Sequence, residues 1–200
     1  MHRTLRLIII VGFMNVSNCI LTDRLIVRPF VKGDEEDVLE LMKDDYTARK
    51  AGFKPFKSVE EARSFIHSWR REGYAVTERS SDKVIGVIQA PIHYWDDKAF
   101  IGYWLGEQYR GKGYMTEAVE AVKEYVFNST FIDEMELYVY CGNEASRNVA
   151  LKCGFYPDYS RYKENVRSAY GTVESEERFT ITRGDFEWEQ RGCSTFSSAA

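Results

Sequence analysis

A strand pattern, a glycine loop and a helical pattern follow one another between residues 99 and 127. Apolar side chains occupy most positions on both faces of the expected strand 99–105, which is typical of a buried central strand. The loop contains Gln108-x-x-Gly111-x-Gly113, and apolar residues then recur at helical spacing through residues 116–127. The pattern predicts that the chain passes from a strand into a helix through this loop.

Periodicity predicts further elements on both sides of this segment. Strands are predicted at residues 25–30, 73–79, 83–94, 156–164 and 174–182, and one more is predicted to begin at Met135. Helices are predicted after Asp34, expected to cap the first, after the Ser58-x-x-Glu61 capping box, and at 147–153 before Gly154. Residues 45–57 are expected to connect the first two helices, and the polar tail 190–200 is expected to be disordered.

The composition is that of one globular domain. The 200 residues are 44% hydrophobic and 14% aromatic, which suffices for a single α/β core, and no linker divides them. The formal net charge of −4 and the isoelectric point near 5.5 argue against nucleic acid as a general partner and weakly favour a cationic substrate.

Cysteine and histidine spacing indicates no metal site. Cys19, Cys141, Cys153 and Cys193 form no Cys-x-x-Cys pair, and the three histidines are scattered. Cys141 and Cys153 fall in apolar patterns, so we expect both to be small core residues in a reducing compartment.

The N-terminus carries a short apolar run. Arg3 and Arg6 precede Leu7–Met14, which has the charge and length of a minimal signal peptide, and Cys19 follows at a lipoprotein-like position. The run is far shorter than the ~20 residues that span a membrane. Our preferred interpretation is a dispensable extension, with Met14 as a possible start, and secretion is the alternative.

The glycine loop has the chemistry of a diphosphate site. The amides of residues 111–114 would leave the first helical turn without an intrahelical partner, and Arg110 and Lys112 add positive charge. The spacing fits neither a dinucleotide fingerprint, which needs a third glycine, nor a Walker loop, which needs Ser or Thr after the lysine.

A second motif follows about thirty residues later. Residues 135–155, MELYVYCGNEASRNVALKCGF, have the pattern of a strand, a polar turn with Asn143 and Ser146, a short helix and a terminal Gly-Phe. Together the two segments resemble the GNAT acetyltransferase superfamily, in which the glycine loop holds the pyrophosphate of acetyl-CoA and the Gly-Phe helix flanks its pantetheine arm. With LTDRLIVRPF at 21–30 and IGYWL at 101–105, they most resemble the ribosomal-protein N-terminal acetyltransferases of the RimJ/RimL type.

The resemblance implies a fold and a co-substrate. The fold is α/β (α+β): one domain over residues 21–189, with a mostly antiparallel mixed sheet of about seven strands flanked by helices, after an extension at 1–20. The co-substrate is acetyl-CoA without a metal, in a cytoplasmic protein that is a monomer or homodimer and has no nucleic-acid or membrane partner. The residues that match the cofactor-binding motifs are Trp104, Leu105, Gln108, Tyr109, Arg110, Gly111, Lys112, Gly113, Tyr114, Met115, Asn143 and Ser146.

The chemistry is attack of a neutral amine on a thioester, which requires proton removal from the amine and is helped by a proton donor to the thiolate. The resemblance places Ser146 near the CoA sulfur as that donor. The alternative is that Ser146 only caps the following helix. Where related acetyltransferases carry a tyrosine four residues before the Gly of Gly-Phe, this chain has Ala150, so the acid role cannot be carried over to that position. Amides at 104–106 are expected to stabilise the oxyanion.

The general base has three open candidates. Glu107 lies next to the glycine loop, and Glu164 lies near where RimL-like proteins carry a glutamate. Either is equally explained as a solvated surface residue, and a water chain is the third possibility. Tyr138 stands where some GNAT enzymes have a glutamate, and with an unperturbed pKa near ~10 tyrosine is a poor base.

Tyr94, Trp95, Asp96 and Asp97 form a cluster of aromatic and acidic residues. We interpret them as a hairpin turn leading into the strand at 99. The alternative is contact with a cationic acceptor by charge and cation–π attraction.

The favoured function is therefore acetyl-CoA-dependent N-acetyltransfer to a protein N-terminal α-amine. Two alternatives stay open: transfer to a small amine such as a polyamine or antibiotic, and a non-catalytic acyl-CoA-binding module.

Overall fold

The computed structural model describes residues 19–70, 72–160, 163–167 and 173–195. The strands are β1 Ile20–Leu21, β2 Leu25–Arg28, β3 Gly73–Glu78, β4 Val84–Gln89, β5 Ile92–His93, β6 Lys98–Leu105, β7 Glu134–Tyr140, β8 Tyr156–Pro157, β9 Lys163–Arg167 and β10 Val173–Thr182. The helices are α1 Asp34–Met42, α2 Asp45–Lys50, α3 Val59–Trp69, the 3₁₀ turn η1 Glu107–Tyr109, α4 Tyr114–Ser129, α5 Glu144–Lys152 and α6 Arg183–Thr195.

Within the described residues the strands form one sheet in the order β1-β2-β3-β4-β6-β7-β10-β8, with β5 beside β6 and β9 beside β10. Every strand pair is antiparallel except β6 and β7, whose parallel pairing runs from Lys98–Glu134 to Ile101–Leu137. Both strands continue past that last pair without pairing to each other. The sheet therefore opens between the C-terminal ends of β6 and β7.

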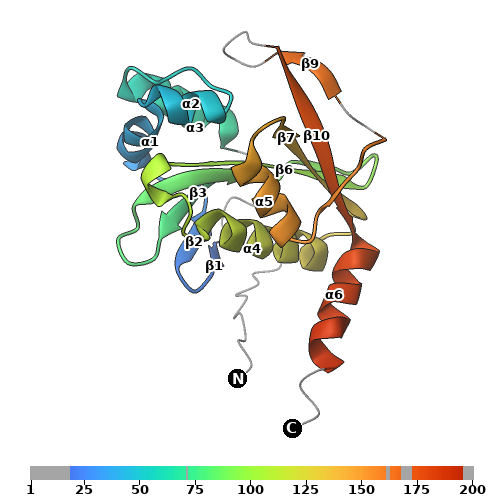
Figure 1. Ribbon diagram of the computed structural model, residues 1–200. Coiled ribbons are helices and arrows are strands. Elements are labelled where there is room, and N and C mark those ends of the chain that lie inside the picture. Colours follow the sequence, from blue (N-terminus) through green and yellow to red (C-terminus); the bar gives the residue numbers. More distant parts are fainter. Residues whose placement is uncertain (1–18, 71, 161–162, 168–172, 196–200) are drawn as a thin grey trace.

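Helices cover both faces of the sheet (Figure 1). One core is built around α4, with Val119, Val122 and Phe127 packed on inward residues of β6, β7 and β10. The other core lies under α1, α2 and α3 and includes Phe65 and Trp104. This is the predicted α/β domain with a mostly antiparallel mixed sheet, and that prediction is confirmed.

Each predicted strand lies at its expected position, but two of them are interrupted. The expected strand 83–94 is interrupted at Ala90–Pro91, because proline has no amide hydrogen to donate to the ladder; the Pro91 carbonyl instead accepts from the Phe100 amide at 3.0 Å. The expected strand 156–164 is likewise divided into β8 and β9. The two interruptions and the short unpredicted β1 account for ten strands in place of about seven.

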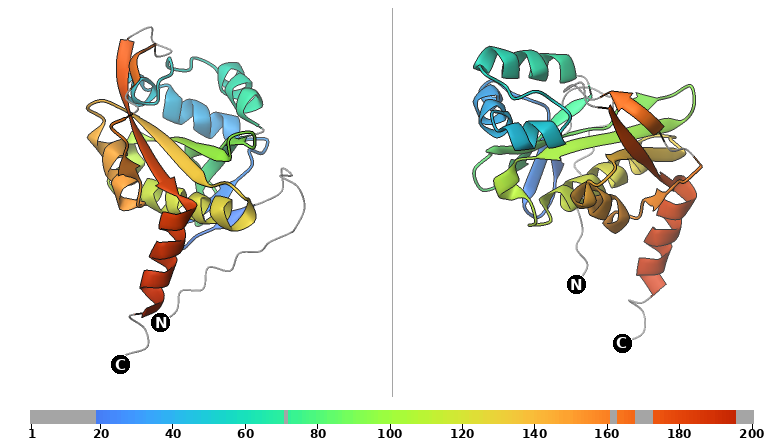
Figure 2. Two further views of the ribbon diagram at one scale, coloured as in Figure 1. Left: turned by 90° about the vertical axis from the view of Figure 1, so that its right-hand side faces the viewer. Right: turned by 45° about the horizontal axis from the view of Figure 1, so that its top comes forward.

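Two helices were not predicted. α2 has only six residues, too few for a periodic pattern, and begins where the Asp44 carboxylate accepts from the Thr47 amide. α6 occupies the first part of the tail that we expected to be disordered, so that prediction is wrong for residues 190–195. Tertiary contacts hold α6, because Phe186 stacks on Phe127 with ring centroids 5.0 Å apart. The helix then projects from the body (Figure 2).

The helix caps and the burial of the cysteines agree only in part with the sequence predictions. Ser58 caps α3 as predicted, accepting from the Glu61 amide at 3.3 Å. Asp34 does not cap α1: Gly33 is the N-cap, and the Asp34 carboxylate binds the buried Arg28 guanidinium at 2.8 Å. Cys153 is buried as expected, whereas Cys141 is exposed because β7 ends one residue before it.

The predictions for residues 1–18, including the dispensable extension and the signal-peptide alternative, lie outside the described residues. Within the described residues no helix is both long and apolar enough to cross a membrane.

Candidate active site

The glycine loop presents backbone amides at the start of α4. Gly111 and Gly113 have φ of 73° and 79°, a left-handed conformation that disfavours residues with a side chain. Gly113 is the N-cap of α4 and has no side chain to satisfy the first amides, and the first intrahelical bond joins the Glu117 amide to the Gly113 carbonyl. A Cβ built on Gly111 meets nothing within 4 Å. The loop therefore offers unpaired amides and the positive end of a helix dipole to an anion.

Arg24, which is 88 positions away from Lys112 in the sequence, stabilises this loop through side-chain contacts. Its Nη1 donates to the Lys112 carbonyl at 2.9 Å, and its Nε donates to the Glu117 carboxylate at 2.7 Å. Its guanidinium also lies over the Tyr114 ring, 4.6 Å from the centroid. Burial opposes ionisation of Glu117, but hydrogen bonds from Thr22 and Arg24 outweigh it and lower the Glu117 pKa. Arg24 was not predicted as a site residue, since nothing local in the sequence connects it to residue 112.

The opening between β6 and β7 exposes the edge of β6. The Gly106 amide donates to the Ile85 carbonyl on the β4 side at 2.9 Å. Because successive peptide groups of a strand point to opposite sides, the amide and carbonyl of Leu105 point toward the opening. The Leu105 carbonyl accepts from Arg110 Nε at 3.1 Å, and the Leu105 amide lies beside it as a donor for an oxyanion.

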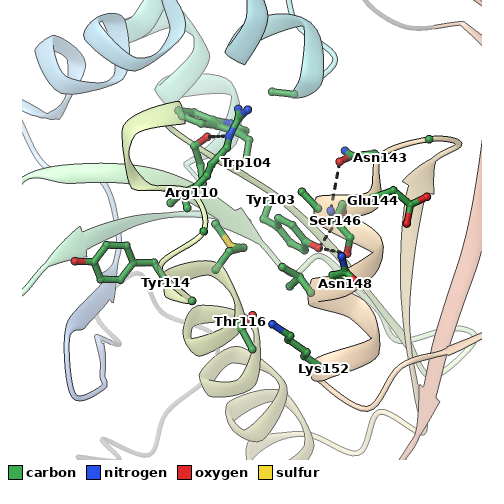
Figure 3. Close-up of a pocket in the computed structure, with 18 of the residues that line it drawn as sticks. Tyr103, Trp104, Arg110, Tyr114, Thr116, Asn143, Glu144, Ser146, Asn148 and Lys152 are labelled. Carbon is green, nitrogen blue, oxygen red and sulfur yellow. Dashed lines mark hydrogen bonds between the residues drawn. The ribbon is translucent and has the colours of Figure 1, made fainter.

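A cavity of about 540 Å³ lies between the glycine loop, the end of β6 and α5 (Figure 3). Nine of the predicted cofactor residues line it: Trp104, Leu105, Arg110, Gly111, Gly113, Tyr114, Met115, Asn143 and Ser146. Three predicted residues lie outside its lining. Gln108 and Lys112 are exposed beside it, and Tyr109 packs under the loop against both cores. The lining also includes Lys152 and Thr116, which were not predicted.

Asn143, and not Ser146, caps α5. The helix begins at Glu144, and the Asn143 side chain accepts from the Ser146 amide at 3.3 Å. The alternative in which Ser146 is only a cap is therefore wrong. The Ser146 hydroxyl instead lies 2.9 Å from the Tyr103 hydroxyl, which also lies 3.2 Å from the Ser146 carbonyl oxygen (Figure 3).

Tyr103 is a site residue that was not predicted as one, since its position was expected only to belong to the buried strand 99–105. Burial raises its pKa, and the hydrogen bond with Ser146 only partly offsets that effect, so the phenol stays protonated near neutral pH. The single phenol proton is donated either to the Ser146 carbonyl oxygen or to Ser146 Oγ, and in the second arrangement the Ser146 proton is free to point into the cavity. The two residues are 43 positions apart, and alternation along β6 was the only available indication of where the ring points.

Of the two predicted carboxylate bases, Glu107 does not line this cavity. Glu107 is exposed on η1 and outside the lining. Glu164 lies on β9, whose side chains fall outside the described part of the structure. Neither role is tested by this geometry, and both stay predictions.

A second cavity of about 340 Å³ lies on the opposite face of the sheet, under α3. The polar, non-aromatic members of its lining are Gln89, Asn143, Ser146 and Glu176. Seven of its fifteen lining residues are aromatic: Phe53, Trp69, Phe100, Tyr103, Trp104, Tyr138 and Tyr140. It shares Ala51, Tyr103, Trp104, Asn143 and Ser146 with the first cavity. The two cavities thus meet at the opening between β6 and β7, beside the Tyr103–Ser146 pair.

On β7, the carboxylate beside the second cavity is Glu136, which already accepts hydrogen bonds from three side chains. Burial opposes its ionisation, but hydrogen bonds from Arg178, Lys98 and the Tyr138 hydroxyl outweigh burial and lower its pKa to about 2. A carboxylate with so low a pKa is a poor base. Among the described residues no group of three or more His, Cys, Asp or Glu side chains is arranged to hold a metal ion.

A family model of the acetyltransferase (GNAT) domain matches residues 24–156. The chain belongs to the GNAT acetyltransferase family. The predicted resemblance is thereby confirmed, and the protein is an N-acetyltransferase of this family. Among curated relatives, the uncharacterized N-acetyltransferase YoaA of Bacillus subtilis is 28% identical over 144 residues, which cover 67% of this chain and 80% of YoaA.

Solved GNAT structures share the fold. RimL, a ribosomal L7/L12 α-N-protein acetyltransferase in complex with coenzyme A, superposes with a TM-score of 0.71 at 19% identity, covering 82% of this chain and 98% of RimL. Spermidine N-acetyltransferase from Vibrio cholerae, in complex with CoA and spermine, has a TM-score of 0.70 at 16% identity, covering 82% of this chain and 99% of that enzyme. At these identities the comparison shows the fold, and protein and small-molecule acetyltransferases both share it.

Proposed function

We propose that this GNAT enzyme binds acetyl-CoA in the first cavity and a primary amine in the second, and that the acetyl group is transferred directly between them. The observation that carries the proposal is the meeting of the two cavities at Tyr103 and Ser146. Direct transfer requires no covalent enzyme intermediate, and the site needs only to orient two substrates and move protons.

The glycine loop holds the diphosphate of acetyl-CoA. The amides at the start of α4 donate to it, with Arg110 and Lys152 as the cations of the cavity. The thioester carbonyl then lies at the opening beside β6, where the Leu105 amide stabilises the negative charge that develops on its oxygen.

The amine nitrogen attacks the carbonyl carbon, a carbon–nitrogen bond forms and the carbon–sulfur bond breaks. Ser146 donates its proton to the departing CoA thiolate and regains a proton from solvent in the cavity, while the hydrogen bond with Tyr103 holds the Ser146 hydroxyl in place. Water in the second cavity removes the proton that the amine loses. Ser146 is the catalytic residue in this scheme, and Tyr103 is a positioning residue that acts through it.

The acceptor class that we favour is the α-amine of a polypeptide, in a cytoplasmic protein where acetyl-CoA is available. The aromatic walls of the second cavity suit the apolar part of a first residue. A polyamine is the second candidate, because a single carboxylate among aromatic rings, Glu176, also suits a second cationic nitrogen.

The test is thiol release from acetyl-CoA with a panel of short peptides bearing free N-termini, spermidine and an aminoglycoside. Peptides are expected to accelerate release above the rate without acceptor, and the acetylated amine is identified by mass spectrometry. Acceleration by spermidine alone would move the acceptor to the polyamine class. No acceleration by any amine would overturn the proposed reaction.

A further inference from the structure

Four aromatic side chains form a ladder from the second cavity to the surface. Tyr138 and Phe100 are stacked with centroids 6.4 Å apart and planes 15° apart, and Phe100 contacts His93 at 4.7 Å. His93 in turn stacks on Trp95 at 4.6 Å and 22°. Phe100 and Tyr138 line the cavity, and Trp95 lies in the exposed turn between β5 and β6.

The outer end of this ladder is not needed for the turn in which it lies. Trp95 is 80% exposed and its neighbour Tyr94 is 62% exposed, so neither ring contributes a buried core. The turn is formed by backbone: the Asp97 φ of 53° reverses the chain, and the Asp97 carbonyl accepts from the Asp133 amide at 2.9 Å. Two large aromatic side chains are thus exposed to solvent on a hairpin whose backbone is fixed by hydrogen bonds. Exposed aromatic side chains of this kind are typical of a binding surface.

The hairpin tip is also acidic. Asp96 and Asp97 are exposed, and no ion pair in the described part of the chain involves either of them. Lys98, the nearest cation in sequence, is turned toward Glu136 at 2.6 Å and Glu134 at 3.5 Å. Negative charge beside an exposed indole favours a cationic side chain, by attraction and by cation–π contact.

We infer that the ladder and the hairpin tip bind the polypeptide segment that follows the acceptor amine, with a Lys or Arg side chain of that segment against Trp95, Asp96 and Asp97. This inference rests on the proposed function, because it continues the acceptor cavity outward. The ladder steps of 4.6, 4.7 and 6.4 Å correspond to roughly five residues of extended chain at about 3.3 Å each. The occupant is therefore a flexible N-terminal segment of about five residues with a basic residue near its third to fifth position.

The experiment compares peptides of two, four and six residues that share their first two residues, with a lysine as the fourth residue of the longer ones. In the wild-type enzyme kcat/KM is expected to rise roughly 5- to 10-fold from two to six residues, the range of one aromatic contact with a cation. In Trp95→Ala the rise should disappear, and kcat/KM for the dipeptide should be unchanged. Trp188→Ala is the matched control, because Trp188 is an exposed tryptophan on α6 and should leave every value unchanged.

A double variant measured with two peptides tests the contribution of the negative charge at the hairpin tip. Asp97→Asn keeps a residue that tolerates the left-handed backbone. Together with Asp96→Asn it should lower kcat/KM about 3-fold for the lysine-containing hexapeptide, and not for the same peptide with serine in place of the lysine. Equal kcat/KM for all peptide lengths in the wild type, or an unchanged length dependence in Trp95→Ala, would overturn this inference and leave the proposed acetyl transfer standing. Failure of every amine to release thiol would overturn both.

Discussion

At the scale of single residues, catalysis and capping in the α5 turn belong to different side chains. Asn143 satisfies the first amides of the helix, and the Ser146 hydroxyl is left for Tyr103 and the cavity. Ser146→Ala is therefore expected to lower kcat by roughly 10²-fold, the usual range for one positioned proton donor, with little change in acetyl-CoA affinity or melting temperature. Asn143→Ala is expected to cost about 1 kcal/mol of unfolding free energy.

Three measurements on each variant separate these roles: kcat, acetyl-CoA affinity by calorimetry and the melting temperature. Tyr103→Phe is the companion variant, because it removes only the hydroxyl that lies 2.9 Å from Ser146 Oγ. It should lower kcat by less than Ser146→Ala, with both substrate affinities retained. Full activity in Ser146→Ala would refute its role as the proton donor.

At the scale of elements, the turn from β6 into α4 depends on two glycines and on Arg24. Gly113→Glu combines a strained left-handed backbone with a carboxylate at the anion site, so it should abolish acetyl-CoA binding in calorimetry. Gly33→Glu is the matched control, since Gly33 has a φ of 107° with open space around it and caps α1, outside the lining of the first cavity. Loss of binding in both variants, or in neither, would contradict the assignment of the loop.

At the scale of the whole molecule, a buried ionic network joins β6, β7 and β10 on the face of the sheet that carries the second cavity. Arg178 pairs with Glu134, Glu136 and Asp158, and Lys98 pairs with the same two glutamates. Glu136 is 2% exposed, so the pairing matters most there. The network holds together the half of the sheet that the helices α1 to α3 leave uncovered.

This network predicts acid sensitivity. The Glu136 pKa is about 2 in the folded protein, below the ~4.3 of an unfolded glutamate. A depressed folded pKa stabilises the protein fully above the unfolded value, and this contribution is lost as the pH falls from about 5 toward 2. The unfolding free energy, measured by denaturant titration, should therefore fall over that window.

Glu136→Gln is the variant that tests the source of this pH dependence. It should be less stable at pH 7, because Arg178 loses a buried partner, and its unfolding free energy should fall less steeply below pH 5. Glu40→Gln, at an exposed pair with Lys43, is the matched control and should keep the wild-type profile. An unchanged slope in Glu136→Gln would show that other carboxylates carry the acid sensitivity.

Much of the fold followed from local patterns. Alternation placed the strands, the Ser58 box placed α3, and glycines placed the turn into α4, because each depends on residues within a few positions of one another. Predictions failed where a distant contact decides the outcome. α6 forms because Phe186 packs on Phe127 of α4. The break in the expected strand 83–94 has a local cause instead, because Pro91 has no amide hydrogen for the ladder.

The sequence by itself determined the family, the glycine loop and most of the residues that line the first cavity, since these lie in short motifs with their own backbone requirements. Only the tertiary structure decided how the site is completed. The Tyr103–Ser146 pair, the Arg24 contact with the glycine loop and the Phe100–Tyr138 step of the ladder join residues 38 to 88 positions apart. No local pattern encodes such contacts, because they arise when the sheet brings separate strands side by side and opens between β6 and β7.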